Sequence, residues 1–294
     1  MSGAADPWAD WLLRRRDGGD AANRAIARAA LHRIRDRLLA GVDPQPGEHV
    51  LDVGCGDGLI GLRAAELVGP TGRVVLSDIS PTLLEHCRQA ALAAGLHERC
   101  AYVVAALPEL RGIADTAFDV VTDRSVLIYI PDKATALAAM HRVLRPGGRL
   151  GLFEPINRFT SARDPGRLWG FAVHGAEELA ARVNAVAAAD APEAAAMLSF
   201  DERDLFTTVA AVGFVDVRMD YHAEVLDGRS PASSIEAFLA TAPNPLAPTY
   251  AELLAEALSP TEAEILRAKL ARAFAAGDHR RRSAVVHISA TRAG

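Results

Sequence analysis

One stretch of the chain, residues 49–61, constrains the fold more than any other. Its sequence is HVLDVGCGDGLIG, in which alternating apolar residues are followed by four glycines and then by leucines at helical spacing. This order predicts a β-strand, a glycine turn and a helix. Glycines let the backbone turn sharply and approach a ligand, with the first N–H groups of the helix facing it. Because a buried carboxylate is costly without a partner, Asp52 within the strand predicts a polar or cationic ligand group at the strand end.

The alternation of strand and helix continues along most of the chain. Further strands are expected at residues 73–79, 100–106, 118–122, 149–153, 214–221 and 283–290, and helices from 21, 59, 81, 133 and 201. Ser80-Pro81 is a typical helix start, an N-cap serine followed by proline at the first helical position. Strands and helices at this spacing predict βαβ units, and therefore an α/β fold with a Rossmann-like, doubly wound, mostly parallel sheet.

Two inserts interrupt this rhythm, at residues 156–200 and 227–282. The second carries helical patterns around 235–239 and 251–270. Because the chain returns to the same sheet after each insert, we expect both to be helical caps within one domain that covers residues 47–294. Residues 1–46 are expected to form N-terminal helices that pack on the sheet or cover its ligand.

Charge and cysteine content restrict the partners. The 294 residues carry a net charge of −5 with acids and bases interspersed, which argues against a nucleic acid or an anionic membrane surface. The basic run Arg280–Arg282 is expected to be a solvated turn. Three cysteines without a CxxC pair predict neither a disulfide framework nor a metal site. No run approaches the roughly 18 apolar residues of a membrane span, so a cytoplasmic protein is expected.

Between residues 47 and 155 the chain resembles the class I S-adenosylmethionine-dependent methyltransferases. The matching segments are VLDVGCGDG (50–58), Asp78 after the second strand, FDVVTDRSVLIYIPD (118–132) and LRPGGRLGLFEP (144–155). The resemblance implies a mostly parallel sheet of seven strands with an antiparallel last strand. It also implies S-adenosylmethionine as the cofactor and methyl transfer to an O, N or C atom of a small organic acceptor. A bulky acceptor from secondary metabolism follows by analogy alone, and a homodimer is the base-rate expectation.

The resemblance further assigns cofactor contacts. The residues it implies are Asp52, Gly54, Cys55, Gly56, Asp78, Ile79, Ala106, Leu107, Asp123 and Arg124. The glycine turn and the backbone near Asp123 would hold the methionine part. Asp78 would accept hydrogen bonds from both ribose hydroxyls, and Ile79 would pack on the adenine. Many relatives carry an acid after the third strand, where this chain has Ala105-Ala106-Leu107, so backbone groups would contact the adenine there.

The catalytic residues are harder to assign, because a sulfonium donor is already activated and positioning supplies most of the catalysis. A base is needed only if the acceptor must lose a proton. The candidates are Glu154 at the end of the fifth strand, Tyr129 where many relatives carry histidine, and His174 in the first insert. Each also has a purely structural interpretation: Glu154 could cap nearby backbone, Tyr129 could be a packed aromatic, and His174 could lie away from substrate.

Two other functions compete with this hypothesis. Residues 56–61 also fit the dinucleotide pattern GxGxxG, with Asp78 about twenty residues further on, which would suit an NAD(P)-dependent oxidoreductase. Asp52 ahead of the first glycine and the Pro146-Gly147-Gly148 turn favour the methyl donor instead. A protein that binds S-adenosylmethionine without transferring its methyl group is the second alternative. Asp52 itself could be satisfied by local backbone rather than by a ligand.

Overall fold

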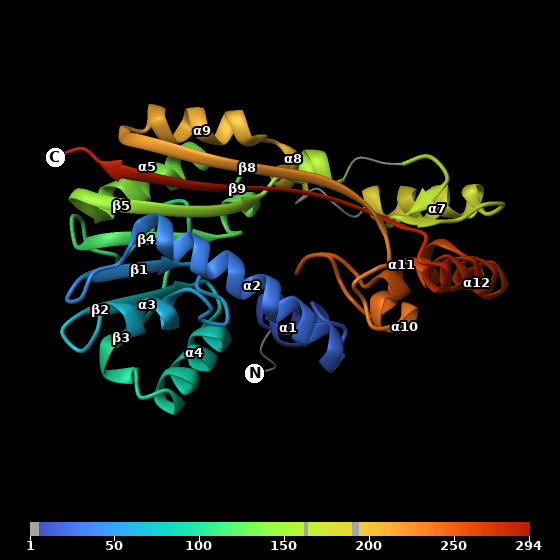
Figure 1. The fold of residues 1–294 in the computed structure, drawn as a ribbon, viewed down its shortest axis with the longest axis horizontal. Coiled ribbons are helices and arrows are strands. Elements are labelled where there is room, and N and C mark those ends of the chain that lie inside the picture. Colours follow the sequence, from blue (N-terminus) through green and yellow to red (C-terminus); the bar gives the residue numbers. More distant parts are fainter. Residues whose placement is uncertain (1–5, 162–163, 190–193) are drawn as a thin grey trace. The chain divides into compact units, whose positions relative to one another are not determined.

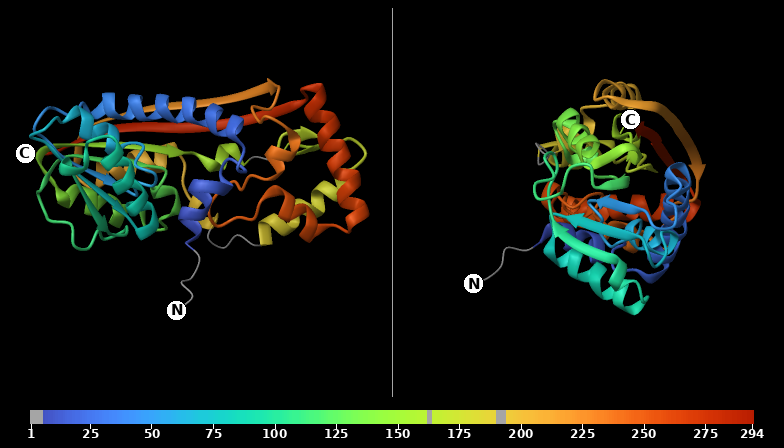
Figure 2. Two further views of the ribbon diagram at one scale, coloured as in Figure 1. Left: turned by 90° about the horizontal axis from the view of Figure 1, so that it is seen from below. Right: turned by 90° about the vertical axis from the view of Figure 1, so that its left-hand side faces the viewer.

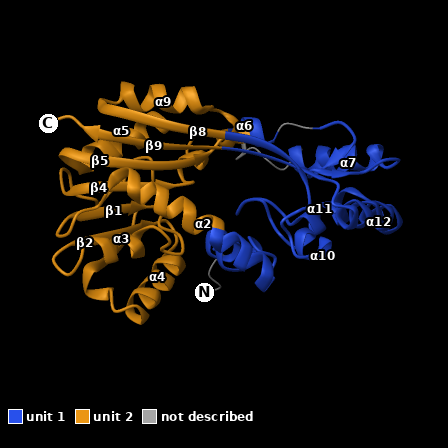
Figure 3. Cartoon of the chain, in the orientation of Figure 1, with its two compact units in different colours: residues 1–29, 158–195, 223–284 blue, residues 30–157, 196–222, 285–294 orange. Residues whose placement is uncertain are grey.

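The computed structural model describes residues 6–161, 164–189 and 194–294. The chain divides into two compact units, shown in two colours in Figure 3. Unit 1 comprises residues 1–29, 158–195 and 223–284, and unit 2 comprises residues 30–157, 196–222 and 285–294. Each unit has a hydrophobic core of its own and is described by itself.

A mostly parallel sheet forms the centre of unit 2 (Figure 1). Its strands lie in the order β3 (Cys100–Val104), β2 (Arg73–Asp78), β1 (His49–Val53), β4 (Phe118–Arg124), β5 (Leu144–Pro155) and β9 (His279–Arg292), and β8 (Phe214–Gly228) pairs with β9. The first five strands pair in parallel, and β9 is antiparallel to β5. The predicted α/β, doubly wound sheet with an antiparallel last strand is therefore confirmed. Its order reverses between β1 and β4, the point at which such sheets bind ligands beyond their carboxyl ends.

The period-two pattern of the strands explains how the sheet of unit 2 is covered. Val50 of β1 lies beside Val74 and Val120 of its two neighbours, and all three belong to one core cluster. Residues of α2 (Ala21–Val42), α3 (Gly61–Leu67) and α4 (Pro81–Ala93) complete that cluster. Leu51, equally buried, points to the opposite face. Along the rest of the unit, α5 (Lys133–Val143) packs on β5 and on α9 (Glu202–Ala211).

The strands of the described sheet number nine, where seven were expected. The additional two, β6 (Arg167–Leu168) and β7 (Phe171–Ala172), have two residues each and are too short to show an alternating pattern. In unit 1 they pair with each other, and Phe171 pairs with His279 of β9. Both β8 and β9, which run as neighbours (Figure 2), also extend beyond the predicted 214–221 and 283–290.

Unit 1 is largely helical. Its helices are α1 (Pro7–Asp10), the π-helical η1 (Trp11–Arg15), α7 (Glu177–Ala189), α10 (Ile235–Leu239), α11 (Tyr250–Ala257) and α12 (Pro260–Ala276). The core joins Phe171 of β7 with Leu254 of α11 and Leu270 of α12. The helical pattern at 251–270 is two helices, because Ser259 accepts a hydrogen bond from Glu262 N and begins α12. The remaining short helices of the chain are η2 (His97–Arg99), η3 (Leu127–Tyr129), α6 (Asn157–Thr160) and α8 (Ala194–Leu198).

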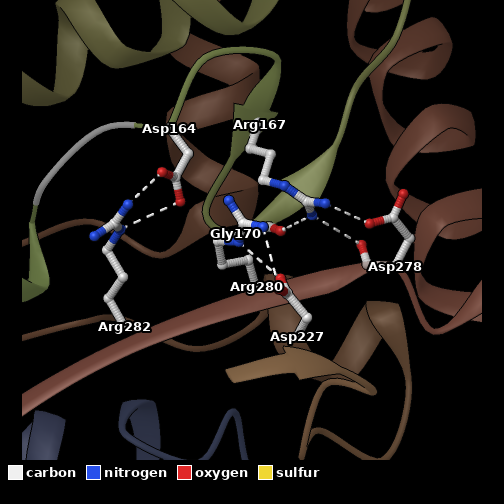
Figure 4. Close-up of polar contacts among 7 residues, drawn as sticks. All are labelled: Asp164, Arg167, Gly170, Asp227, Asp278, Arg280 and Arg282. Carbon is white, nitrogen blue, oxygen red and sulfur yellow. Dashed lines mark hydrogen bonds and ion pairs between the residues drawn. The ribbon is translucent and has the colours of Figure 1, made fainter. Parts of the chain in front are cut away.

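The run Arg280–Arg282 is not the solvated turn that its charge suggested, because it lies in β9. Figure 4 shows how the first and last of these arginines are neutralised within unit 1. Arg280 donates to Asp227 at 2.7 Å, and Arg282 donates to Asp164 at 2.5 Å. Arg167 of β6 adds a third pair with Asp278 at 2.6 Å. These ion pairs tie the β6–β7 hairpin and the end of β8 to the start of β9.

Among the residues that the structure describes, none forms a helix with the length and apolar composition needed to cross a bilayer.

Candidate cofactor-binding site

The glycine turn after β1 forms a cradle at the carboxyl end of the unit 2 sheet. Gly54, Gly56 and Gly58 have φ angles of +60°, +55° and +81°, a region that favours glycine. A Cβ atom on Gly54 would lie 2.3 Å from Cγ2 of Val126, so no side chain fits there. Val126 thus fills the space beside Gly54, and both this contact and the positive φ require glycine at that position.

Asp78, at the end of β2, is fixed by the same turn. Its carboxylate accepts hydrogen bonds from Gly56 N and from Ser80 N, each at 2.9 Å. The side chain is buried, whereas the next residue, Ile79, is 47% exposed. An oriented acid beside an uncovered apolar side chain provides hydrogen-bond acceptors and a flat apolar surface side by side.

Asp52 lies inside β1 and is almost fully buried. Its carboxyl group accepts hydrogen bonds from Gly61 N and from the Thr122 hydroxyl, both at 2.8 Å. Burial raises the pKa of Asp52 to about 7, because the charged form loses its hydration. The observed partners are thus protein groups, as the local alternative for Asp52 supposed, and its contact with a ligand stays a prediction.

Cys55 is the turn residue whose side chain faces the protein interior. Its sulfur lies 4.0 Å from that of Cys87, and the Cys87 thiol donates to Gly56 O at 3.2 Å. The contact with Cys87, together with burial, raises the pKa of Cys55, so this thiol stays protonated. Cys55 therefore packs its side chain under the turn and offers only its backbone to a ligand.

The end of β3 lacks an acidic side chain, as the sequence indicated. Ala105 N donates to Asp78 O at 3.2 Å, which holds this segment beside the end of β2. Ala106 is exposed and Leu107 is half-buried. An adenine contact through backbone groups at these two residues stays a prediction.

Asp123 and Arg124 end β4, next to β1 in the sheet. The Asp123 carboxyl is fully buried, and neither of its oxygens receives a hydrogen bond from the described residues. Burial and then the negative charge of Glu154 raise the pKa of Asp123 well above its ordinary value. The positive charge of the half-buried Arg124 lowers the pKa of Asp123, but by less than burial and Glu154 raise it.

Glu154, the first catalytic candidate, is fully buried at the end of β5. Its carboxylate accepts hydrogen bonds from the backbone N–H groups of Val126, Leu127 and Ile128, at 3.0, 3.0 and 3.2 Å. This is the backbone-capping role that the sequence left open for Glu154. A role as proton acceptor from a substrate stays a prediction.

The other two catalytic candidates lie in different units. Tyr129 ends η3 in unit 2, and burial raises the pKa of its hydroxyl, which stays protonated at neutral pH. His174 is exposed in unit 1, and its backbone oxygen accepts a hydrogen bond from Lys269 Nζ at 2.8 Å. The structure therefore assembles Asp52, Asp78, Asp123, Glu154 and the glycine turn within unit 2, and His174 belongs to the other unit.

Sequence reasoning missed the residues that support this site. Thr122 binds the Asp52 carboxyl, and Val126 covers Gly54. Thr122 could have been found, because it pairs with Asp52 in the register of β1 and β4. Val126 carried no such signal, since it lies in a turn whose course depends on Glu154.

Comparison with known proteins identifies the family. A model of the methyltransferase domain matches residues 44–164. Nocamycin O-methyltransferase from Saccharothrix syringae is 38% identical over 213 residues, which cover 68% of this chain and 70% of that protein. The chain belongs to the class I S-adenosylmethionine-dependent methyltransferases.

Other relatives of this methyltransferase match a shorter region. The ubiquinone/menaquinone biosynthesis C-methyltransferase of Ectopseudomonas mendocina is 39% identical over 132 residues, 44% of this chain and 50% of that one. This chain thus spans only half of that relative's length. A solved protein from Bacillus halodurans C-125 has the same fold, with a TM-score of 0.55 at 17% identity and coverage of 88% of this chain and 99% of that one.

Membership of the methyltransferase family confirms S-adenosylmethionine as the cofactor and decides against the nicotinamide alternative for the glycine pattern. The residues present fit this cofactor on two observations. Gly54 and Gly56 take positive φ angles at the end of β1, and the Gly56 N–H holds the Asp78 carboxylate at the neighbouring strand end.

Proposed function

We propose that this methyltransferase transfers the methyl group of S-adenosylmethionine to an O, N or C atom of a small organic acceptor of secondary metabolism. Its likeness to nocamycin O-methyltransferase over 68% of the chain is the observation that carries the proposal. Aklanonic acid methyltransferase of Streptomyces sp. strain C5, 38% identical over 122 residues, supports the same class of acceptor. A net charge of −5 also suits a small acceptor better than a nucleic acid.

In this proposal the chain contributes mainly position. The bound cofactor would supply an activated methyl group: an acceptor atom would bond to the methyl carbon as its bond to sulfur breaks, and S-adenosylhomocysteine would leave. Asp78 would hold the ribose hydroxyls, Ile79 the adenine, and the Gly54–Gly56 backbone with the end of β4 the methionine part. Held in this way, the methyl group and the acceptor react as if intramolecular.

Tyr129 is the side chain that we propose to orient the acceptor. A tyrosine hydroxyl is protonated at neutral pH and burial raises the pKa of Tyr129 further, so it would donate a hydrogen bond rather than remove a proton. His174 remains the candidate base for acceptors that must lose a proton. A Tyr129→Phe variant is expected to raise KM for the acceptor while leaving binding of S-adenosylhomocysteine within about twofold.

The proposal is tested in two steps. Calorimetry with S-adenosylmethionine, S-adenosylhomocysteine, NAD and NADP should give binding of the S-adenosyl compounds alone. The purified protein is then incubated with labelled S-adenosylmethionine and small acceptors that offer a hydroxyl, an amine or a carbon nucleophile. Label in an organic product supports the proposal. Label found only in added RNA, DNA or protein would overturn the small-molecule assignment while leaving the family intact.

A further inference from the structure

Glu154 connects the end of β5 to the segment that follows β4. One oxygen, Oε1, accepts hydrogen bonds from Val126 N and Leu127 N, and Oε2 accepts one from Ile128 N. A fully buried carboxylate with three backbone donors is held rigidly. These bonds fix the course of the chain into η3, which ends at Tyr129.

Val126 carries this constraint into the glycine turn. Its Cγ2 atom lies 2.3 Å from the position that a Cβ on Gly54 would take, so the two residues are in close contact. A displacement of Val126 would therefore move the residue that covers the first glycine of the cofactor cradle. Glu154 therefore fixes the position of Val126, and Val126 in turn contacts the glycine turn.

The nearest polar neighbour of Glu154 on β4 is another carboxyl group. Asp123 and Glu154 lie within hydrogen-bonding reach of each other, and both are fully buried. The N–H group near Asp123 is that of Val126, and this N–H donates to Glu154 Oε1 at 3.0 Å, so neither Asp123 oxygen receives a well-aligned hydrogen bond from the described residues. Two ionised carboxylates in contact without donors between them would repel strongly, whereas a single proton converts the contact into a short, charge-assisted hydrogen bond.

We propose that Asp123 and Glu154 share one proton, and that the pair is a positioning device that fixes residues 126–129 against the glycine turn. Asp123 carries the proton and donates it to Glu154, which keeps its negative charge for the three backbone N–H groups. Glu154 is thus a positioning residue in this proposal.

The surrounding charges are consistent with a pair that holds one negative charge in total. Arg124 lies on the same strand as Asp123, Asp52 on β1, Tyr129 on η3 and Lys133 on α5. The Lys133 ammonium is hydrogen-bonded to other groups: it donates to Ile130 O at 3.0 Å and to Ala196 O at 3.2 Å. Burial raises the pKa of both Asp123 and Glu154, because each charged form loses its hydration.

The first test uses Asp123→Asn, which replaces the shared proton by an amide N–H at the same place. A proton held by the folded chain but not by the unfolded one makes stability fall as pH rises. The melting temperature of the wild type should therefore fall by roughly 3 °C or more beyond that of Asp123→Asn between about pH 5 and about pH 9. Equal pH slopes for the two proteins would overturn the shared proton.

The second test follows amide hydrogen exchange at residues 126–128 near pH 7 without ligand. Glu154→Gln keeps one acceptor oxygen but turns an NH₂ group toward Ile128 N, so exchange of that amide should rise at least roughly tenfold. In Asp123→Asn it should stay within about threefold of wild type, because the Glu154 carboxylate is retained. Glu66→Gln changes an exposed glutamate of α3 and controls for the substitution itself.

These two readouts need neither cofactor nor acceptor, so they are independent of the proposed function. Unchanged exchange in Glu154→Gln, or equally fast exchange in Asp123→Asn, would overturn the positioning role. A further consequence concerns the cofactor: Glu154→Gln should weaken S-adenosylhomocysteine binding roughly tenfold, because Val126 no longer holds the glycine turn. Wild-type affinity in a variant with fast exchange would exclude the link from Val126 to the cradle.

Discussion

Among single residues, Asp78 combines a structural and a binding role. Its carboxylate accepts hydrogen bonds from Gly56 N and Ser80 N at the end of β2, where we propose that it also accepts from the ribose hydroxyls. Asp78→Ala should weaken S-adenosylhomocysteine binding roughly hundredfold or more, because two hydrogen bonds to a charged acceptor are lost. Calorimetry on the folded variant measures this. Glu98→Ala, at an exposed acid of the same unit, should bind as the wild type does, and near-normal affinity of Asp78→Ala would remove Asp78 from the site.

Asp52 gives the chain a pH dependence whose sign follows from its burial. The pKa of Asp52 is raised from 3.8 to about 7, so between these values the folded chain holds a proton that the unfolded chain releases. The free energy of unfolding should therefore fall as pH rises through this range, by about 4 kcal/mol from Asp52 alone. Urea unfolding at several pH values measures how steeply the free energy of unfolding changes with pH.

The matched variant for this prediction is Asp52→Asn. Its amide oxygen can accept from Gly61 N while its NH₂ group donates to the Thr122 hydroxyl, so the contacts persist without a titrating group. The slope between about pH 4 and about pH 7 should be shallower in this variant. A variant that keeps the wild-type slope would show that other groups cause it.

Between elements, the contact of Gly54 with Val126 joins the β1 turn to the turn after β4. Gly54→Ala should destabilise the fold by roughly 2–4 kcal/mol, because its Cβ would overlap Val126 at φ +60°. Val126→Ala removes the two overlapping methyl groups, so the double variant should recover part of this loss. Denaturant unfolding of the four proteins gives the coupling energy, and simple additivity would argue against the contact.

Some helices and strands could be predicted from the sequence and others could not. Alternating apolar residues and the Ser80-Pro81 start predicted β1, β2 and α4, because these signals are local. The two-residue strands β6 and β7 have no local pattern and exist only through their pairing in unit 1. Asp123 and Glu154 could be placed at strand ends. Their contact, and the three backbone bonds of Glu154, depend on how the turn after β4 folds back.

At the scale of the whole molecule, the described residues form a buried apolar cluster in each unit, and every proposed cofactor contact belongs to unit 2. Residues 1–29 and most of the two predicted inserts make up unit 1. Leu76 in the core of unit 2 and Leu254 in the core of unit 1 are both fully buried, so the two sites offer a matched pair of substitutions.

Leu76→Ala and Leu254→Ala should each lower the free energy of unfolding by roughly 2–5 kcal/mol, because each leaves a cavity in a packed core. Their effects on cofactor binding should differ. Leu76 lies against Gly61, at the end of the glycine turn, so its truncation should weaken S-adenosylhomocysteine binding severalfold. Leu254→Ala should leave the affinity within about twofold, as calorimetry well below the melting temperature can measure. If Leu254→Ala weakened binding as much as Leu76→Ala does, the cofactor site would have to draw on unit 1 as well.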